Sequence, residues 1–268
     1  IFVAGHRGMV GSAIVRALRA ANFTNIITRN RETLDLTNET AVNAFFEAVK
    51  PEYVYMAAAK VGGIVANDTY PVDFLLDNLR IQNAVISAAH RHGIKKLLFL
   101  SSLCIFPKDA PQPIKEEYLL SAPLEPTNQW YSVAKIAGVK LCQALRKQHG
   151  FDAIIVNPVN LYGPNDNFHP DNSHVLPALI RRIVDAESSG KSVITCWGSG
   201  NPRREFLHVD DLAEACLHLM DVYSDMETVN VGCGTDISIK ELAELVQNIV
   251  GWQGTIEWDT SKPDGVTQ

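Results

Sequence analysis

Apolar residues recur with two different spacings along the first half of the chain. Short apolar runs, typical of buried strands, occur at 1–5, 25–28, 53–56, 96–102 and 153–158. Longer segments with apolar residues at helical spacing separate these runs, at 9–22, 39–49, 73–92 and 130–150. Strands that alternate with helices in this way indicate an α/β fold with a doubly wound parallel sheet, covered by helices on both faces.

The pattern becomes less regular after Pro158. Residues 158–174 are rich in Pro, Asn, Asp and His and predict a loop. The remaining elements are predicted as helices at 175–188, 210–223 and 238–250 and short strands near 193–196, 228–231 and 254–258. We expect a Rossmann-type, NADP-binding domain at 1–160, to which segments at about 205–232 return, and a smaller α/β substrate-binding lobe at 161–204 and 233–268. The abrupt last residues lead us to expect that this lobe is truncated at its C-terminus.

The segments that directly follow the predicted parallel strands are expected to share one crevice. Ligands of such sheets bind at the carboxyl ends of the strands. In this chain those ends are followed by Gly5 and by residues 57–63, 101–106 and 158–164. Any chemistry should therefore be sought in these four segments.

The segment "GHRGMVG" places Gly5, Gly8 and Gly11 between the first strand and the first helix. Glycines at this spacing allow a tight turn and let backbone N–H groups approach a pyrophosphate at the helix N-terminus. The strand–turn–helix context predicts dinucleotide binding, and a purely structural turn is the alternative.

The charges near the end of the second strand indicate which dinucleotide is bound. An NAD site normally offers an acidic side chain about 20 residues after the glycines, to hold the ribose 2′-hydroxyl. This chain has Arg29 and Arg31 there, with Arg7 inside the glycine turn. Basic side chains suit a 2′-phosphate, so we predict NADP. Asp35 keeps an NAD site open as the alternative, and the arginines could also be solvated surface charges.

The segment "YSVAK" sets Tyr131 and Lys135 one helical turn apart on the same face. A tyrosine with an ordinary pKa of about 10 is a poor acid–base group near neutrality. A neighbouring ammonium group should favour the phenolate and lower that pKa, and the lysine could also hold ribose hydroxyls. The pair predicts a catalytic tyrosine, and a tyrosine packed in the core is the alternative.

The composition limits the classes of partner. A net charge of −6 argues against a nucleic-acid-binding surface, which is normally basic. No apolar run is long enough for a membrane span, and no signal peptide precedes the first strand. The five cysteines are scattered and never form C-x-x-C, so we expect free thiols, no metal site and a cytoplasmic protein.

The spaced glycines, Ser102 and the Tyr131–Lys135 pair resemble the extended short-chain dehydrogenase/reductases. Further segments strengthen the resemblance: "AAAKVGGI", "EPTN", "NLYGPNDNFHPDNSHVLPALIRR", "WGSG", "REFLHVDD" and "SKPDG". The resemblance is closest to members that act on GDP-4-keto-6-deoxy-D-mannose. It implies NADPH as cofactor, a homodimer, inversion of the sugar at C3 and C5, and reduction at C4.

The resemblance also implies catalytic roles for individual residues. Cys104 and His174 match the acid–base pair that inverts C3 and C5, and Tyr131 would protonate the C4 oxygen while Ser102 hydrogen-bonds to it. If 101–106 is extended, Ser102 and Cys104 point the same way. The alternatives are a buried apolar role for Cys104 and a helix-start role for His174. Leu103 and Phe106 replace a serine and a tyrosine that are common in the family.

The remaining predicted contacts concern the two ligands. The predicted cofactor contacts are Gly5, His6, Arg7, Gly8, Met9, Val10, Gly11, Arg31, Asp35, Leu36, Lys135, Pro158, Asn160, Leu161 and His174. The predicted substrate contacts are Arg182, Trp197, Arg204 and Asp264, with the arginines placed to neutralise a diphosphate. Arg181 could replace Arg182, and the alternatives are surface charges for the arginines and core packing for Trp197.

Two other functions stay open at this stage. The first is a related nucleotide-sugar epimerase or a simple 4-ketoreductase, although a simple reductase has no use for Cys104 together with His174. The second is a non-catalytic dinucleotide-sensing module, although such modules tend to lose the tyrosine or the lysine that this chain retains.

Overall fold

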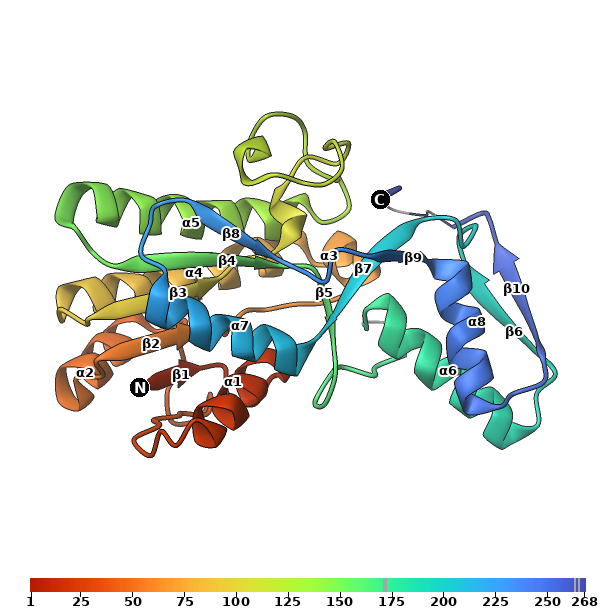
Figure 1. The fold of residues 1–268 in the computed structure, drawn as a ribbon, viewed down its shortest axis with the longest axis horizontal. Coiled ribbons are helices and arrows are strands. Elements are labelled where there is room, and N and C mark those ends of the chain that lie inside the picture. Colours follow the sequence, from red (N-terminus) through yellow and green to blue (C-terminus); the bar gives the residue numbers. More distant parts are fainter. Residues whose placement is uncertain (171–172, 263, 265) are drawn as a thin grey trace.

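Five parallel strands form the central sheet of the computed structural model, which describes residues 1–170, 173–262, 264 and 266–268 (Figure 1). The strands are β1 (Phe2–Ala4), β2 (Tyr53–Met56), β3 (Lys96–Leu100), β4 (Ala153–Pro158) and β8 (Thr228–Val231), hydrogen-bonded in that order. In register, Val54 lies opposite Leu97, and Leu100 opposite Val156. The parallel order places the carboxyl ends of β1 to β4 at one edge.

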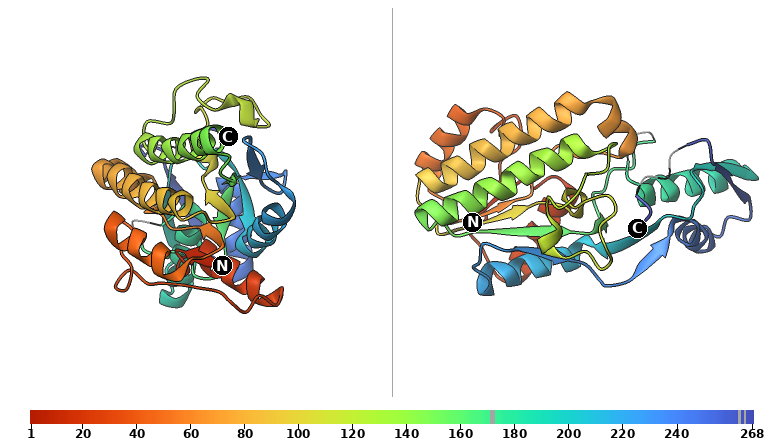
Figure 2. Two further views of the ribbon diagram at one scale, coloured as in Figure 1. Left: turned by 90° about the vertical axis from the view of Figure 1, so that its left-hand side faces the viewer. Right: turned by 90° about the horizontal axis from the view of Figure 1, so that it is seen from above.

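Helices cover both faces of this sheet. One face carries α2 (Glu39–Val49), α4 (Pro71–Arg91) and α5 (Gln129–His149), and the other carries α1 (Met9–Ala20) and α7 (Val209–Val222) (Figure 2). Successive side chains of a strand point to opposite faces, so β3, which is buried throughout and apolar after Lys96, supplies both cores. Phe99 belongs to the core under α4 and α5, whereas Leu98 belongs to the core under α1 and α7.

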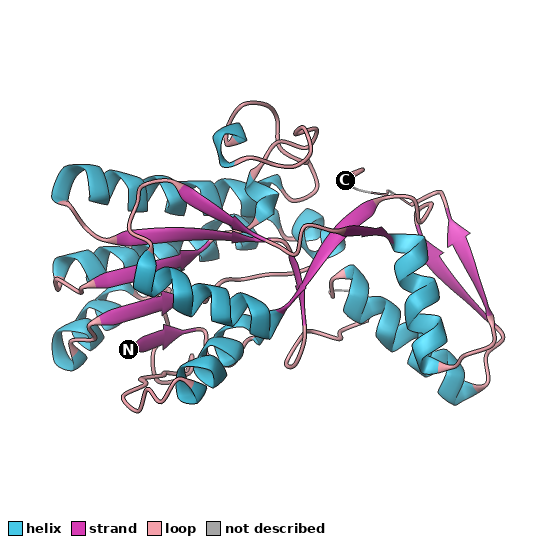
Figure 3. Ribbon diagram, viewed as in Figure 1, coloured by secondary structure: helices cyan, strands magenta, loops and turns pink. Residues whose placement is uncertain are grey.

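A smaller lobe has its own core at the C-terminal side of the chain (Figure 3). Strands β6 (Val193–Trp197) and β10 (Thr255–Asp259) pair in parallel, and α6 (Val175–Ser189) and α8 (Ile239–Val250) pack on them. A capping box begins α8, because Ser238 and Glu241 satisfy each other's backbone N–H groups. Gly190 and Gly251, both with positive φ, end the two helices.

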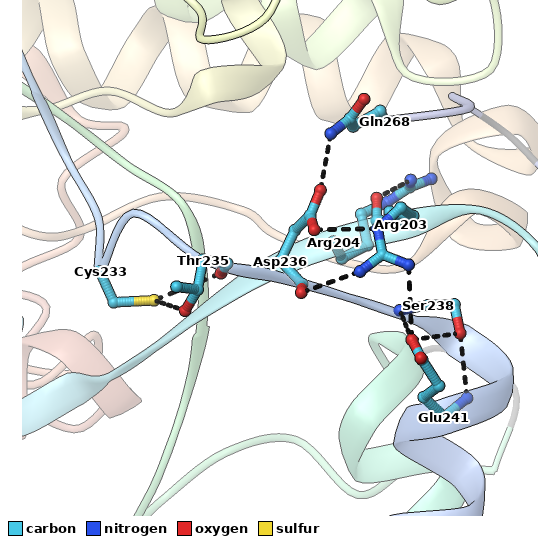
Figure 4. A network of polar contacts seen from close by, with 8 residues as sticks. All are labelled: Arg203, Arg204, Cys233, Thr235, Asp236, Ser238, Glu241 and Gln268. Atoms are coloured by element: carbon cyan, nitrogen blue, oxygen red, sulfur yellow. Dashed lines mark hydrogen bonds and ion pairs between the residues drawn. The ribbon is translucent and has the colours of Figure 1, made fainter.

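A three-stranded sheet lies between the central sheet and the smaller lobe. Strand β7 (Arg203–His208) pairs in parallel with β5 (Asn160–Tyr162) and antiparallel with β9 (Asp236–Ser238). Arg203 strengthens this sheet, since its guanidinium donates to Asp236 (2.9 Å) and Glu241 (3.4 Å) (Figure 4). Gln268 donates to the second oxygen of Asp236 (2.6 Å), which ties the last residue to β9.

The structure confirms the predicted α/β fold class, and four local predictions were wrong. Residues 25–28 form only one bridge, between Ile27 and Phe2, because polar residues follow immediately. The predicted strand at 96–102 ends at Leu100. The predicted loop at 158–174 contains β5, and its residues 171 and 172 lie outside the description.

The fourth error is a group of short elements that the apolar pattern did not predict. They are β7, β9, α3 (Ile64–Thr69) and the 3₁₀ turns Leu103–Ile105 and Glu116–Tyr118. Charged residues interrupt the apolar pattern of β7, whose pairing partners are distant in sequence. Within the described ranges, no helix combines the length and the apolar character needed to cross a membrane.

Candidate active site

The segments that follow β1 to β3 meet at one edge of the central sheet. The backbone N–H of Ala57, after β2, donates to Ala4 at the end of β1 (3.0 Å). The N–H of Ser101, after β3, donates to Val156 in β4 (2.8 Å). The glycine turn, the 101–106 segment and the start of α5 therefore lie at the same edge of the central sheet.

The glycine turn is packed too closely for side chains. A Cβ on Gly11 would lie 2.1 Å from the carbonyl oxygen of Gly5, and one on Gly5, where φ is +87°, would lie 2.7 Å from the nitrogen of Ala58. Gly8 is the N-cap of α1, and no side chain caps this helix. The turn thus presents the first N–H groups of α1, which fits the pyrophosphate of a dinucleotide.

The side chains predicted to recognise the ribose lie on the loop before α2. Asp35 accepts hydrogen bonds from the N–H and hydroxyl of Thr37, at 2.9 and 2.8 Å, and these bonds lower its pKa. Arg31 is 83% exposed and lies 4.0 Å from Asp35. Burial and the charge of Arg7 lower the pKa of His6 in the adjacent turn. Thr37 thus engages one oxygen of Asp35, whereas the Arg31 side chain extends into solvent.

Lys135 is buried between α5 and the end of β3. Its side chain is nearly inaccessible, its Nζ donates to the Leu100 carbonyl (2.8 Å), and this nitrogen lies 4.8 Å from the centre of the Phe99 ring. Burial lowers the pKa of Lys135 to about 7. The Lys135 amine therefore changes between its charged and neutral forms near neutral pH.

Tyr131 lies beside this lysine, with the Lys135 Nζ 5.8 Å from its ring centre. Burial raises the pKa of Tyr131, and the neighbouring Cys104 raises it further. The predicted lowering of this pKa by Lys135 was wrong for the protein alone, because burial favours neutral forms of both side chains. The Tyr131 hydroxyl is therefore protonated at neutral pH.

Ser102 and Cys104 do not lie on an extended segment, so the predicted geometry was wrong. Residues Leu103–Ile105 form a 3₁₀ turn, and the Ser102 hydroxyl caps it by accepting the N–H of Cys104 (3.2 Å). The hydroxyl of Ser132, the neighbour of Tyr131, donates to the Cys104 carbonyl (2.7 Å). This bond ties the turn to the first turn of α5.

Cys104 is an exposed residue, but neighbouring protein atoms desolvate its thiol, which lies near the positive charge of Arg204. Burial raises its pKa, against a smaller lowering by a hydrogen bond from Ser102 and by the positive charge of Arg204. Arg204 itself interacts electrostatically with Cys104, Glu125 and Asp264. Cys104, Tyr131 and Arg204 are thus brought together, from three elements distant in sequence.

His174 is the N-cap of α6 and is exposed as a residue, although neighbouring protein atoms desolvate its imidazole. Burial of the ring environment lowers its pKa, and the negative charge of Asp166 partly opposes this. Its interaction with Asp166 is local to the loop before α6. The neutral imidazole can accept a proton at pH 7.

The other predicted substrate residues are distributed over the smaller lobe. Arg182 donates to the Thr195 carbonyl (2.8 Å), and Arg181 donates to the Phe168 carbonyl (3.0 Å). Trp197 is exposed, with Lys262 5.6 Å from its ring centre. The Asp264 carboxylate accepts the N–H (2.6 Å) and hydroxyl (2.8 Å) of Ser199, so it holds the 198–200 turn.

Three predicted cofactor residues lie at the end of β4 or just after it. Pro158 ends β4, and Asn160 and Leu161 belong to β5. The Asn160 amide donates to the Glu205 carbonyl in β7 (3.1 Å), which holds this side chain against the neighbouring strand of the three-stranded sheet.

Sequence reasoning missed Glu125, Ser132 and Asp166. Glu125 is buried and pairs with Lys108 at 3.2 Å. The "EPTN" segment contains Glu125, but nothing in its spacing indicated a charge partner for Arg204. The contacts of Glu125 and Ser132 depend on distant segments, whereas Asp166 contacts residues of its own loop and His174 at the start of α6.

A family model described as the NAD dependent epimerase/dehydratase family matches residues 1–232. A "Putative GDP-L-fucose synthase 2" from Arabidopsis thaliana is 62% identical over 265 residues, covering 99% of this chain and 81% of that protein. A "GDP-L-fucose synthase" from Escherichia coli (strain K12) is 50% identical over 274 residues, covering 99% and 85%.

A solved structure has the same fold over nearly the whole chain. It is a GDP-mannoheptose C4 reductase from Campylobacter jejuni with NADP bound. Its TM-score is 0.89 at 39% sequence identity, with 97% of this chain and 86% of that chain covered.

Replacing the buried amine should stabilise the fold in a pH-dependent way. Since the pKa of Lys135 falls from 10.5 to about 7 on folding, the folded state bears the full cost of the charge below pH 7. That cost, at most about 5 kcal/mol, declines as the pH rises from 7 toward the pKa of the unfolded chain. Urea titrations should therefore give Lys135→Met a higher unfolding free energy than the wild type at pH 6. The difference between the two proteins should be smaller at pH 9.5.

The matched control is Lys140→Met, on the exposed face of the same helix. It should change the unfolding free energy equally at both pH values. A difference between Lys135→Met and wild type that does not depend on pH would contradict the buried, neutral lysine.

Adding a methyl group to the glycine turn should weaken dinucleotide binding. Gly11→Ala forces backbone atoms apart, so NADPH should bind about tenfold more weakly, a loss of ~1.4 kcal/mol, in fluorescence titrations. The melting temperature should fall as well. Gly8→Ala, whose Cβ would lie 3.5 Å from its nearest neighbour, should keep the wild-type melting temperature. Equal melting temperatures for the two variants would contradict the close packing at Gly11.

Proposed function

The chain belongs to the NAD dependent epimerase/dehydratase family, and on this premise we propose that it makes GDP-L-fucose. It is an NADP(H)-dependent epimerase/reductase that acts on GDP-4-keto-6-deoxy-D-mannose, as its similarity to GDP-L-fucose synthases supports. The structural observation that carries the proposal is the position of Cys104 beside Tyr131 and Arg204. A thiol at this place adds an acid–base group to a site that already has a catalytic tyrosine.

The reaction has an epimerisation stage and a reduction stage. Removal of a proton from C3 or C5 gives an enol of the C4 ketone, and return of a proton to the opposite face inverts that carbon. NADPH, when bound, supplies the hydride that converts the C4 ketone to an alcohol. The C4 oxygen takes one proton, so the reduction consumes one NADPH and one proton.

Tyr131 donates the proton to the C4 oxygen. Its raised pKa keeps the hydroxyl protonated until negative charge develops on that oxygen. Ser102 hydrogen-bonds to the same oxygen. Lys135 holds the ribose of the cofactor and supports Tyr131, and its pKa of about 7 lets it become charged when an anionic group arrives beside it.

Cys104 and His174 exchange the protons at C3 and C5. Burial raises the pKa of the thiol and lowers that of the imidazole, so at neutral pH one group is a proton donor and the other can accept. This complementary state suits a reaction that removes a proton from one face and returns one to the other.

The ligands divide between the two parts of the fold. The central sheet and glycine turn hold NADP(H), with contacts from Gly5 to Gly11, Arg31, Leu36, Pro158, Asn160 and Leu161, and with Asp35 shaping the loop. The smaller lobe holds the GDP-sugar. Arg204 and Arg182 neutralise the diphosphate, Trp197 offers an aromatic face, and Asp264 holds the turn beside it.

We also infer a cytoplasmic homodimer. All five cysteines are free thiols, which suits a reducing compartment. Helices α4 and α5 lie side by side on one face of the sheet, and Val72, Leu76, Trp130 and Val133 are exposed apolar residues on them. Pairing of this face with a second copy would bury them.

Heavy water distinguishes this enzyme from a simple C4 reductase. Incubation with GDP-4-keto-6-deoxy-D-mannose and NADPH in deuterium oxide should give GDP-L-fucose with deuterium at both C3 and C5, detected by NMR. Each inversion exchanges a carbon-bound proton with solvent, whereas reduction alone exchanges none. A reduced product that keeps the mannose-derived configuration, without deuterium, would show a C4 reductase instead.

Cys104→Ser should block the inversions and leave the reduction intact, because a serine hydroxyl is a far weaker acid than a thiol. The variant should form GDP-L-fucose at least about a hundredfold more slowly, in line with the loss of a general acid–base group. It should still oxidise NADPH with a ketone whose C3 and C5 are already inverted. GDP-L-fucose formation at the wild-type rate would show that Cys104 is not an acid–base group for the inversions.

Introducing negative charge on the exposed faces of α4 and α5 should separate the proposed dimer into monomers. The double variant Leu76→Glu/Val133→Glu should halve the apparent mass in sedimentation, because burying two carboxylates per chain is unfavourable. Leu245→Glu/Ile249→Glu, on exposed positions of α8, is the matched control and should keep the wild-type mass. An unchanged mass for the first variant would place the interface elsewhere.

A further inference from the structure

One buried amide contacts the catalytic helix without belonging to the predicted site. Gln82 lies on α4 and is 1% exposed. Its Nε2 donates to the carbonyl of Ala134 on α5 at 2.6 Å. Ala134 stands between Tyr131 and Lys135 in the sequence, so this bond reaches α5 within the catalytic turn.

The same region of α5 is pressed tightly onto the sheet. A Cβ on Gly138 would lie 2.5 Å from Cζ of Phe99 and 3.0 Å from Cδ of Gln82. The Phe99 ring in turn lies beneath the Lys135 amine. Gln82, Gly138 and Phe99 therefore determine how closely this turn of α5 approaches the end of β3, where Lys135 reaches the Leu100 carbonyl.

The amide of Gln82 contributes little to net stability. Only its nitrogen can donate to a carbonyl, so its Oε1 points away from Ala134, and this oxygen is buried without a hydrogen-bond partner among the described residues. An unpaired buried acceptor costs about 1–3 kcal/mol, comparable to or more than the ~1 kcal/mol that the Nε2 bond returns. The Ala134 carbonyl already accepts the N–H of Gly138 within the helix. An apolar side chain of similar size would thus fold at least as well.

We propose that Gln82 is a positioning residue, whose hydrogen bond to Ala134 holds Tyr131 and Lys135 at the distance from β3 that catalysis requires. This inference rests on the proposed function. Small displacements of reacting groups reduce rates strongly, because only a narrow range of geometries is productive. The amide is retained for that geometry, although it gives no advantage in stability.

The test compares Gln82→Leu with Gln143→Leu. Gln143 also lies on α5 and donates its amide to a backbone carbonyl of another segment, that of Met226 (3.1 Å), but two turns beyond Lys135. Single-turnover oxidation of NADPH by the sugar nucleotide should be about tenfold or more slower in Gln82→Leu. The KM for the sugar nucleotide should stay within about twofold, and the melting temperature should equal or exceed that of the wild type. Gln143→Leu should keep the wild-type rate.

A wild-type rate in Gln82→Leu would overturn the proposal, and so would a slower rate accompanied by an equal loss in Gln143→Leu. If Gln82→Leu does not fold, the amide is needed for stability and that part of the argument is wrong. The same rate measurement on Gln82→Met, whose side chain is unbranched like that of glutamine, then decides the positioning role.

If the wild type itself does not reduce the sugar nucleotide, the proposed function fails. NADPH affinity then tests Gln82 alone, since Gln82→Leu should bind NADPH several-fold more weakly than Gln143→Leu, and equal affinities would overturn the inference.

Discussion

The contact between the first turns of α5 and the end of β3 is the constraint on which the site depends. Lys135 donates to Leu100 at the end of that strand, and Ser132 donates to Cys104 in the turn that follows it. The absence of a side chain at Gly138 lets the helix come this close. A helix and a strand that are far apart in sequence are thereby joined at the residues proposed to carry the chemistry, so a shift of one element relative to the other would move these groups apart.

Burial controls the protonation of the site more than pairs of charges do. It raises the pKa values of Tyr131 and Cys104 and lowers those of Lys135 and His174. All four groups are thus shifted toward their neutral forms at pH 7. Charge in the crevice comes chiefly from Arg204, which Glu125 and Asp264 accompany. An enzyme whose acid–base groups are neutral at rest can both give and take protons, and anionic ligands would supply the charges that alter these values.

The three-stranded sheet couples the two parts of the fold mechanically. Strand β7 carries Arg204 toward Cys104 and carries Arg203 toward β9 and the beginning of α8. Adjacent residues of one strand point to opposite sides, so one arginine belongs to the crevice and the other to the framework. The last residue also joins this framework through Asp236. The position of the Arg204 guanidinium, which we propose binds the substrate diphosphate, therefore depends on contacts in the smaller lobe.

The sequence by itself determined the α/β class, the glycine turn at the start of α1 and the Tyr131–Lys135 spacing on one helix, because these features depend on local periodicity and on residues close in the chain. Only the tertiary structure decided that 25–28 forms a single bridge, that Cys104 lies on a 3₁₀ turn, and that Glu125 faces Arg204. It also decided the direction of the pKa shift of Tyr131, against the expectation from its neighbour in sequence. Desolvation and pairing across the sheet arise from atoms that distant segments supply, and spacing along the chain does not report them.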